Sequence, residues 1–298
     1  VQLDQETSYT EARETLQYAI QAMHFEMRPI HINVAFDEPL YEQGLASTPM
    51  SFEWPSDSFK KHGISEEFAA PDFSSFPAVA VVAGQLWPEE SAIVRSLLDE
   101  GVSWTLFADP MSGLLDHPNT APMEALLQVK PDAVLSIGGQ WINKKPKQYL
   151  RSLGIQKHVH VDTFQCWDVL DANVEHLRFS PYLLKHWKSA TNFIQVSKNE
   201  HPAVALPWSD AVAFRGIVDH LDDATVLHLG NSSVARYFNY FPKRLALYGN
   251  RGVAGIDGSL STAVGAALAD PMRKHTVVLG DQSFLYDHNA LYAQELPQ

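Results

Sequence analysis

The sequence predicts an α/β protein built on doubly wound parallel sheets, and three observations support this fold class. Short, nearly all-apolar segments typical of strands buried on both faces recur along the chain. Segments of helical length and pattern alternate with them, and Gly or Pro often separates the two. At 298 residues the chain is long enough for two domains.

The first part of the chain reads as the end of a domain. Residues 7–25 carry a helical apolar pattern, and residues 29–36 alternate as a strand does. A helix followed by a single strand suits the last piece of an α/β domain. Residues 37–76 are rich in Pro, Ser, Glu, Asp and Phe with weak periodicity, so we interpret them as a long linker.

A second region begins at Pro77, where the rhythm of the sequence changes. We expect strands at 78–84, 104–108, 133–137 and 158–161. The segment 88–101 predicts a helix, because Pro88 stands in its first turn and Glu89 and Glu90 lie at the positive end of its dipole. A second helix is expected near 121–129.

The last region repeats the alternation of strands and helices. Strands are expected at 225–230, 246–248 and 276–281, and helices at 209–221, at 257–268 and from about residue 287. Ser232 is predicted to cap a further helix that runs through Tyr240. A parallel sheet with so few strands is expected to be incomplete.

Composition excludes some classes of partner. The formal net charge of -13 argues against nucleic acid or an anionic membrane as the main partner. No apolar run reaches the roughly 18 residues of a membrane-spanning helix. The single cysteine, Cys166, cannot form an intramolecular disulfide, which favours a reduced, cytoplasmic setting over a catalytic cysteine.

The candidate chemistry follows three predicted strands, where open α/β sheets bind their ligands. The stretches are GNSSVAR from Gly230, NRGVAGIDG from Asn250, and GDQS from Gly280. Each residue also has a purely structural interpretation. Ser232 and Asp281 could be helix caps, Arg236 could be a solvated surface residue, and the glycines could only permit a tight turn.

The combination favours an anionic ligand. Glycine-rich backbone before a helix exposes N–H groups that suit a phosphate or carboxylate. Asp281, after a buried strand, suits a Mg²⁺ ion that bridges a diphosphate. The dinucleotide fingerprint GxGxxG does not occur.

These stretches together resemble a known family. NRGVAGIDG, followed by Ser261 and Thr262, resembles the NRGxxGIDGxxST block of the 2-succinyl-5-enolpyruvyl-6-hydroxy-3-cyclohexene-1-carboxylate synthase (MenD) family. GNSSVAR and GDQSFLYD are similar to its GNSxxxR and GDxSFLxD blocks. Residues 31–34 (HINV) and 38–41 (EPLY) are similar to the end of its first domain, and residues 81–84 (VVAG) to the opening of its central domain.

The resemblance implies a domain layout and site roles. Residues 1–40 would end a pyrimidine-binding domain, 41–76 would link, 77–195 would form the central domain, and 196–298 an incomplete diphosphate-binding domain. Asp281 would hold Mg²⁺ or Mn²⁺, and Arg236, Arg251, Lys144 and Lys145 would bind substrate. Thiamine diphosphate (ThDP) would contact a set of cofactor-binding residues: Ser232, Gly255, Ile256, Asp257, Gly280 and Ser283.

The chain departs from the family pattern at Lys145, where Arg is usual. Arg would be the better bidentate clamp for a carboxylate, which puts the role of Lys145 in doubt. From the residues alone, we interpret the Lys144–Lys147 run as the solvated start of a helix, and only the resemblance assigns Lys144 and Lys145 to substrate binding. Gln282 stands where ordinary ThDP motifs have Gly, a position at which this family tolerates other residues.

The resemblance also implies the reaction. ThDP and Mg²⁺ would support decarboxylation of 2-oxoglutarate and addition of the resulting carbanion to isochorismate, a step of menaquinone biosynthesis. The active site would lie between two subunits of a dimer or tetramer. The glutamate that activates ThDP in this family has no counterpart here, so no catalytic residue is assigned, and the isolated chain is expected to be a piece without synthase activity.

Two alternatives remain open. One is another ThDP enzyme, such as an acetolactate synthase or a 2-oxoacid decarboxylase. Arg236 and Arg251 argue against it, since a small monocarboxylate would not require them. The other is a non-catalytic α/β binding module.

Overall fold

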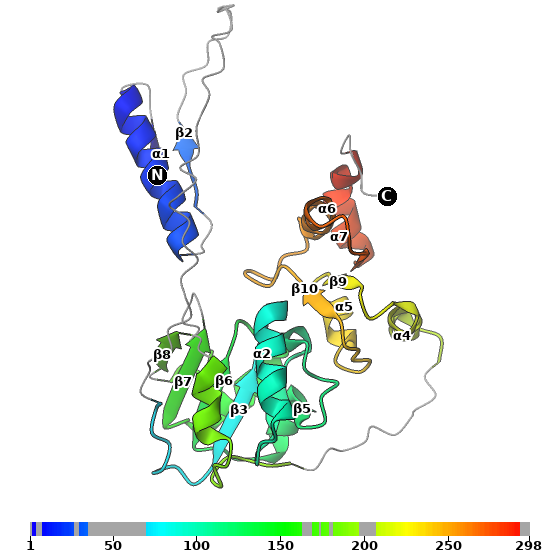
Figure 1. Cartoon of the computed structure of the whole chain (residues 1–298). Helices are drawn as coiled ribbons and strands as arrows, with labels where there is room; N and C mark the ends of the chain where they lie inside the picture. Colours follow the sequence, from blue (N-terminus) through cyan, green and yellow to red (C-terminus); the bar gives the residue numbers. More distant parts are fainter. Residues whose placement is uncertain are drawn as a thin grey trace, which may run out of the picture. The chain divides into compact units, whose positions relative to one another are not determined.

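The computed structural model describes residues 2–3, 8–26, 30–34, 70–162, 169–172, 174–178, 181–196 and 207–292 (Figure 1). The chain divides into two compact units, Val1–Ser65 and Glu66–Gln298. Every strand pair is parallel, so the predicted fold class is confirmed. Cys166, residues 37–69 of the predicted linker, and residues 29, 35 and 36 of the predicted strand lie outside the described residues.

The first unit contains a short β-α-β arrangement. Strand β1 (Gln2–Leu3) pairs with β2 (Asn33–Val34), and helix α1 (Tyr9–Glu26) connects them. A capping box starts α1, because Ser8 Oγ accepts from the Glu11 N–H while the Glu11 carboxylate accepts from the Ser8 N–H. The predicted helix is confirmed, and the described strand is shorter than the predicted 29–36.

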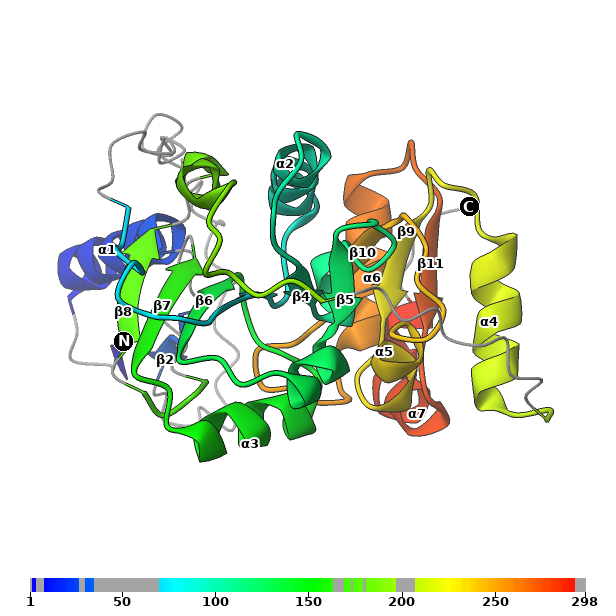
Figure 2. The same ribbon diagram turned by 90° about the horizontal axis from the view of Figure 1, so that it is seen from below.

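The second unit contains a six-stranded parallel sheet with the order β5-β4-β3-β6-β7-β8. From β3 the chain adds β4 and β5 on one side, and then β6, β7 and β8 on the other, so the strand order reverses between β3 and β6. Its strands are β3 (Val79–Ala83), β4 (Leu106–Ala108), β5 (Thr120–Pro122), β6 (Ala133–Ile137), β7 (Lys157–Asp162) and β8 (Val174–Arg178). Figure 2 shows helices α2 (Pro88–Asp99) and α3 (Lys144–Leu153) on opposite faces of this sheet, as a doubly wound fold requires.

Each face of the six-stranded sheet has its own core. Alternate residues of β3 divide between them: Val79, Val81 and Ala83 pack with α2, and Ala80 and Val82 pack on the α3 side. Because both faces are buried, these strands are apolar throughout instead of alternating with polar residues.

Two elements of this sheet differ from the sequence prediction. The helix expected near 121–129 is instead strand β5 followed by a 3₁₀ helix, η2 (Met123–Gln128). Pro122 fits there because β5 is an edge strand, where a missing N–H leaves no ladder bond unmade. Strand β8 was not predicted, since its sequence VEHLR is too polar for a buried strand. It lies at the opposite edge.

A second sheet follows in the same unit, with the order β10-β9-β11. It comprises β9 (Val226–Leu229), β10 (Ala246–Tyr248) and β11 (His275–Val278). Helices α4 (Asp210–His220) and α5 (Ser233–Tyr237) share a core with it, while α6 (Ser259–Ala269) and α7 (Asp281–Asp287) pack on each other. Two short 3₁₀ helices, η1 (Pro110–Ser112) and η3 (Pro181–Trp187), precede it, and η4 (His288–Tyr292) follows α7.

Two predictions for this region need correction. The last helix begins at Asp281 and not near Asp287, because Gly280 is its N-cap and Asp281 places a negative charge at the positive end of the helix. Ser232 does precede α5, yet its side chain makes no capping hydrogen bond, and the helix ends at Tyr237 and not at Tyr240.

The loops that leave β3 and β6 fill the crevice at the point where the strand order reverses. The Gly84 N–H donates to the Ile137 carbonyl over 2.8 Å, and the Gly139 N–H donates to the Gln85 carbonyl over 2.8 Å. A Cβ on Gly84 would lie 2.0 Å from the Gly139 oxygen. Backbone therefore approaches backbone too closely here for any side chain.

We predict that Gly84→Ala lowers the free energy of unfolding by about 2 kcal/mol or more, because an overpacked buried site forces backbone shifts. The matched control is Gly216→Ala in α4, where an added Cβ meets nothing within 4 Å. That variant should be neutral or stabilising by up to about 1 kcal/mol. Urea unfolding of both variants measures this, and equal midpoints for the two would contradict it.

Candidate functional site

The loops after β9, β10 and β11 meet at the carboxyl edge of the second sheet. The side-chain amide of Asn231, which follows β9, donates to the Asn250 carbonyl over 2.8 Å and also to the Gly255 carbonyl. The hydroxyl of Ser283, in α7, donates to the Ile256 carbonyl over 2.7 Å. The structure therefore brings together the three stretches that the sequence singles out.

The middle loop leaves much of its backbone open. An added Cβ at Gly252, Gly255 or Gly280 would meet nothing within 4 Å. Gly258, the N-cap of α6, has a φ of 80°, in the left-handed region that favours glycine. Ala254 has a φ of 54°, which is uncommon for a residue with a side chain. The main-chain atoms of this loop are therefore accessible to a ligand.

The first turn of α6 binds the side chain of Asp287, from the end of α7. One oxygen of Asp287 accepts from the Ser261 N–H over 2.7 Å, and the other accepts from the Ser261 hydroxyl. Asp287 is buried. The sequence suggests that this helix start could receive a ligand phosphate, but the chain's own carboxylate occupies part of it.

Most predicted cofactor residues are accessible from solvent. Ser232 is exposed and has a φ of 73°, a strained value for a residue that makes no capping bond. Gly255, Asp257 and Gly280 are exposed, and Ile256 is half-buried. Ser283 is the exception, since its buried hydroxyl is used by Ile256.

The predicted metal ligand, Asp281, is exposed in the first turn of α7. Within the described ranges, no group of three or more His, Cys, Asp or Glu side chains is placed to hold a metal ion. Asp281 is thus a single potential ligand, and its role remains a prediction.

Arg251 lies almost fully inside the protein, with 8% of its surface exposed. One terminal nitrogen donates to the side-chain oxygen of Asn231, and its Nε has no hydrogen-bond partner. Burial lowers the pKa of Arg251, the carboxylate of Asp109 opposes that effect, and the nearby Arg236 adds to it. Arg236 itself is exposed in the last turn of α5, so the two predicted substrate-binding arginines are electrostatic neighbours.

Asp109, directly after β4, is a site residue that the sequence analysis missed. It is fully buried, and its two oxygens accept from the N–H groups of Met111 over 3.0 Å and Ile142 over 2.6 Å. Burial raises its pKa to about 6, while these bonds and the charges of Arg251 and Lys147 act in the opposite direction. The rule that singled out Asp281, an acid directly after a buried strand, would also have found Asp109.

Lys147 is the lysine of the 144–147 run that lies nearest this centre. It is half-buried in α3, and its Nζ donates to the Trp141 carbonyl over 2.9 Å. Burial lowers the pKa of Lys147, and the positive charges of Arg251, Arg151 and Lys144 lower it further. The carboxylate of Asp109 acts in the opposite direction. Lys144 and Lys145 are exposed in the first turn of α3.

We call Asp109, Arg251, Lys147, Arg236 and Lys144 the charge cluster. The charges of Arg251 and Lys147 act on the carboxyl of Asp109, while Arg236 acts on Arg251 and Lys144 acts on Lys147. An excess of cations beside accessible main chain suits a substrate that carries several carboxylates.

Two glutamine side chains attach the middle loop to the six-stranded sheet. Gln85 Nε2 donates to the Gly249 carbonyl over 3.0 Å, and Gln140 Nε2 donates to the Gly252 carbonyl over 2.8 Å. Both glutamines belong to the loops that leave β3 and β6. The crevice of the first sheet thus holds the glycine-rich loop of the second.

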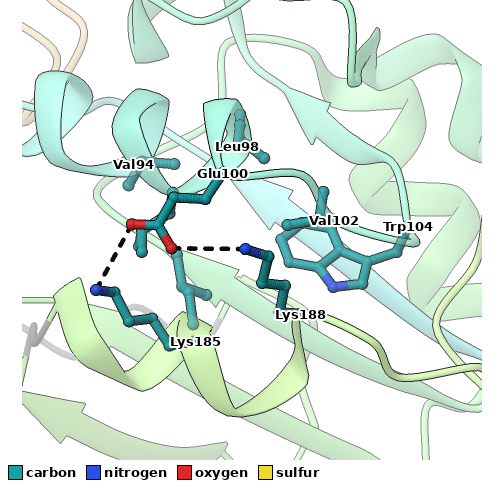
Figure 3. A pocket seen from close by; sticks show the side chains of 9 residues that line it. Val94, Leu98, Glu100, Val102, Trp104, Lys185 and Lys188 are labelled. Carbon is teal, nitrogen blue, oxygen red and sulfur yellow. Dashed lines mark ion pairs between the residues drawn. The ribbon is translucent and has the colours of Figure 1, made fainter.

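A small pocket elsewhere contributes nothing to this site. Figure 3 shows it between α2 and η3, with Glu100 forming ion pairs of 3.6 Å with both Lys185 and Lys188. Apolar side chains such as Val94 and Trp104 line the rest of it. It contains none of the predicted site residues, and partly exposed ion pairs of this kind contribute little to stability.

Comparison with known proteins identifies the relatives of this chain. It is 29% identical to the 2-succinyl-5-enolpyruvyl-6-hydroxy-3-cyclohexene-1-carboxylate (SEPHCHC) synthase of Christiangramia forsetii over 91% of this chain and 53% of that protein. For the enzyme of the same name from Flavobacterium psychrophilum the identity is 27%, over 95% and 56%. This chain is a relative of the SEPHCHC synthases.

The relationship is strongest over part of the chain. A SEPHCHC synthase of Bacteroides fragilis is 34% identical over 54% of this chain and 31% of that protein. The resemblance inferred from NRGVAGIDG and its companion stretches is confirmed. The chain spans about half the length of the curated relatives it matches. No family profile matches it.

A solved structure supports the same fold. A protein from Mycobacterium smegmatis, described as a thiamin diphosphate-dependent enzyme, aligns with a TM-score of 0.54 and 16% identity, over 75% of this chain and 49% of that one. At this identity the match supports the α/β fold alone. None of the described helices is long and apolar enough to cross a membrane.

We predict a specific pH dependence of stability from Asp109. Its pKa is about 6 in the folded chain and about 3.9 when unfolded, so the folded state binds more protons between these values. The wild type should therefore lose up to roughly 3 kcal/mol relative to Asp109→Asn as pH rises from about 4 to about 6. Urea titrations at several pH values measure the difference, which should stay constant above pH 7. A difference that does not change across this range would show that Asp109 ionises normally.

Proposed function

We propose that this chain belongs to a SEPHCHC synthase, a ThDP- and Mg²⁺-dependent transferase that decarboxylates 2-oxoglutarate and joins the product to isochorismate. The observation that carries the proposal is the meeting of three loops at one sheet edge, through the hydrogen bonds of Asn231 and Ser283. Those loops carry the stretches shared with the SEPHCHC synthase family.

The residues present fit a diphosphate cofactor. The open backbone around Gly255 and Gly280 has room for phosphate oxygens to approach. Ser232 offers an exposed hydroxyl next in sequence to Asn231, which binds the middle loop. Ile256 would support the cofactor, with Asp257 and Ser283 completing the contacts that the resemblance implies. Asp281 would hold Mg²⁺ or Mn²⁺. When bound, ThDP would supply an electron sink for decarboxylation of a 2-oxoacid.

The chain's own side chains would bind and orient the substrates. Arg236 and Arg251 are neighbours in the charge cluster and would receive carboxylates of 2-oxoglutarate and isochorismate. Lys144 and Lys145, exposed at the start of α3, would add positive charge at the entrance. Fixed cations that need no rearrangement when charge moves are an effective way to stabilise a transition state.

The wider setting is part of the same proposal. A homodimer or tetramer would complete the site, with the activating glutamate contributed by a pyrimidine-binding domain. We place the end of that domain at residues 1–40, the central domain at 77–195 and the diphosphate-binding domain at 196–298. A cytoplasmic location suits the low cysteine content and the menaquinone precursors used. The 298-residue chain alone should lack synthase activity.

The test uses the full reading frame that encodes this chain. We expect isochorismate-dependent CO₂ release from 2-oxoglutarate with ThDP and Mg²⁺, and a loss of about 100-fold or more in kcat/KM for Arg251→Ala, since a buried charge-assisted clamp would be removed. Arg236→Ala should also lower kcat/KM.

The matched control is Arg215→Ala, because Arg215 is exposed on α4, where it pairs with Asp219 over 3.5 Å and lies over the ring of Phe241, outside the predicted site. It should retain wild-type rates. No activity with these substrates, but release of CO₂ from pyruvate, would instead identify a ThDP enzyme with a different acceptor. Binding without turnover of any 2-oxoacid would favour the non-catalytic module.

A further inference from the structure

Asp109 is a buried carboxylate that none of the proposed substrate or cofactor contacts uses. It has no exposed surface, and both of its oxygens are engaged by main-chain N–H groups. A charged side chain is costly to bury unless it is hydrogen-bonded and paired with an opposite charge. The segments and charges that surround Asp109 therefore indicate its role.

The two residues that bind Asp109 are themselves part of the second sheet's core. Met111, in η1, and Ile142, before α3, both pack in the cluster that contains Leu227, Leu229 and Leu247. Gly249 approaches Met111 so closely that an added Cβ would lie 2.9 Å from its methyl carbon. Asp109 therefore fixes two segments against which the start of the Arg251 loop is packed.

The charges that face Asp109 are all positive. Arg251, from the loop after β10, and Lys147, from α3, both interact with its carboxylate. Arg236 acts in turn on Arg251, and Arg151 and Lys144 act on Lys147. Without Asp109, the like charges of the buried Arg251 and the half-buried Lys147 would repel each other with no buried counter-charge to balance them.

We propose that Asp109 is a positioning residue of the carboxylate-binding site: through Met111 and Ile142 it fixes the segments against which the start of the Arg251 loop packs, and it adds a buried counter-charge for Arg251. This rests on the proposed function, in which Arg251 binds a substrate carboxylate. Asn231 accepts a hydrogen bond from one end of the Arg251 guanidinium. Asp109 acts on the positive charge of that group through space.

Asp109→Asn separates charge from shape. The amide keeps one oxygen to accept from Met111 or Ile142, but its NH₂ group cannot accept from the other N–H, and the negative charge is gone. In the full-length holoenzyme we expect kcat/KM for 2-oxoglutarate to fall about tenfold or more, mainly through a higher KM, because losing a hydrogen bond to a charged group commonly has this effect.

A double-mutant cycle with Arg251→Ala distinguishes positioning from a general structural role. If Asp109 acts through Arg251, Asp109→Asn should change kcat/KM less than about threefold in the Arg251→Ala background. If the two losses multiply instead, Asp109 acts independently of Arg251 and the proposal is overturned. Unchanged kinetics in Asp109→Asn alone, with Arg251→Ala impaired, would overturn it as well.

Asp116→Asn is the matched control, since it makes the same chemical change at the carboxylate that binds Arg95 over 2.6 Å, on the same segment but outside the charge cluster. It should leave KM for 2-oxoglutarate unchanged. A wild type that does not turn over 2-oxoglutarate, or an Arg251→Ala variant as active as the wild type, would reject the proposed function itself, which distinguishes that failure from the failure of Asp109 alone.

A measurement on the wild type keeps the test open if Asp109→Asn does not fold. The profile of kcat/KM for 2-oxoglutarate should decrease as pH falls through about 6, where Asp109 gains its proton. The same limb should be missing in Arg251→Ala, because Asp109 acts through Arg251, and it should be retained in Lys147→Gln. Arginine itself stays charged in this range and cannot produce the limb. A flat wild-type profile from pH 5 to 7, or a limb that survives in Arg251→Ala, would refute the proposal.

Discussion

The hydrogen bonds between the loops that leave β3 and β6 are the constraint on which the site depends. In an open α/β sheet, the reversal of strand order leaves a crevice that commonly receives a ligand. Here Gly84 and Gly139 close that crevice with main-chain atoms, and their neighbours Gln85 and Gln140 reach out to the glycine-rich loop. The crevice of the first sheet thus binds the glycine-rich loop of the second sheet through these glutamines.

That arrangement explains how an acidic protein can present a cationic centre. The net charge is -13, yet the charges of Arg251 and Lys147 both act on the buried carboxyl of Asp109. Burial would drive such cations apart or neutralise them unless counter-charge and hydrogen bonds held them. Main-chain hydrogen bonds and the charges of Arg251 and Lys147 offset only part of the cost of burying Asp109, since its pKa is still raised to about 6.

The strand and helix pattern was largely predictable, and the failures have local causes. Buried parallel strands such as β3, β6 and β9 are apolar throughout and stand out in the sequence. The edge strands β5 and β8 do not, because one side of each is free and their residues are Thr-Ala-Pro and a mostly polar run. The sequence predicts Ser232 as a helix cap, but the residue has a positive φ and its side chain makes no capping hydrogen bond.

The sequence by itself determined the fold class, the family resemblance and the three loops that meet, because strand ends in a parallel sheet share an edge whatever the details. The tertiary structure alone decided which charges face one another. Lys144, Lys145 and Lys147 belong to one short lysine-rich run, yet α3 exposes the first two and half-buries the third, whose Nζ donates to the Trp141 carbonyl. Asp287 likewise reaches the start of α6 only through packing of α7. Such contacts join residues distant in sequence, so no local pattern records them.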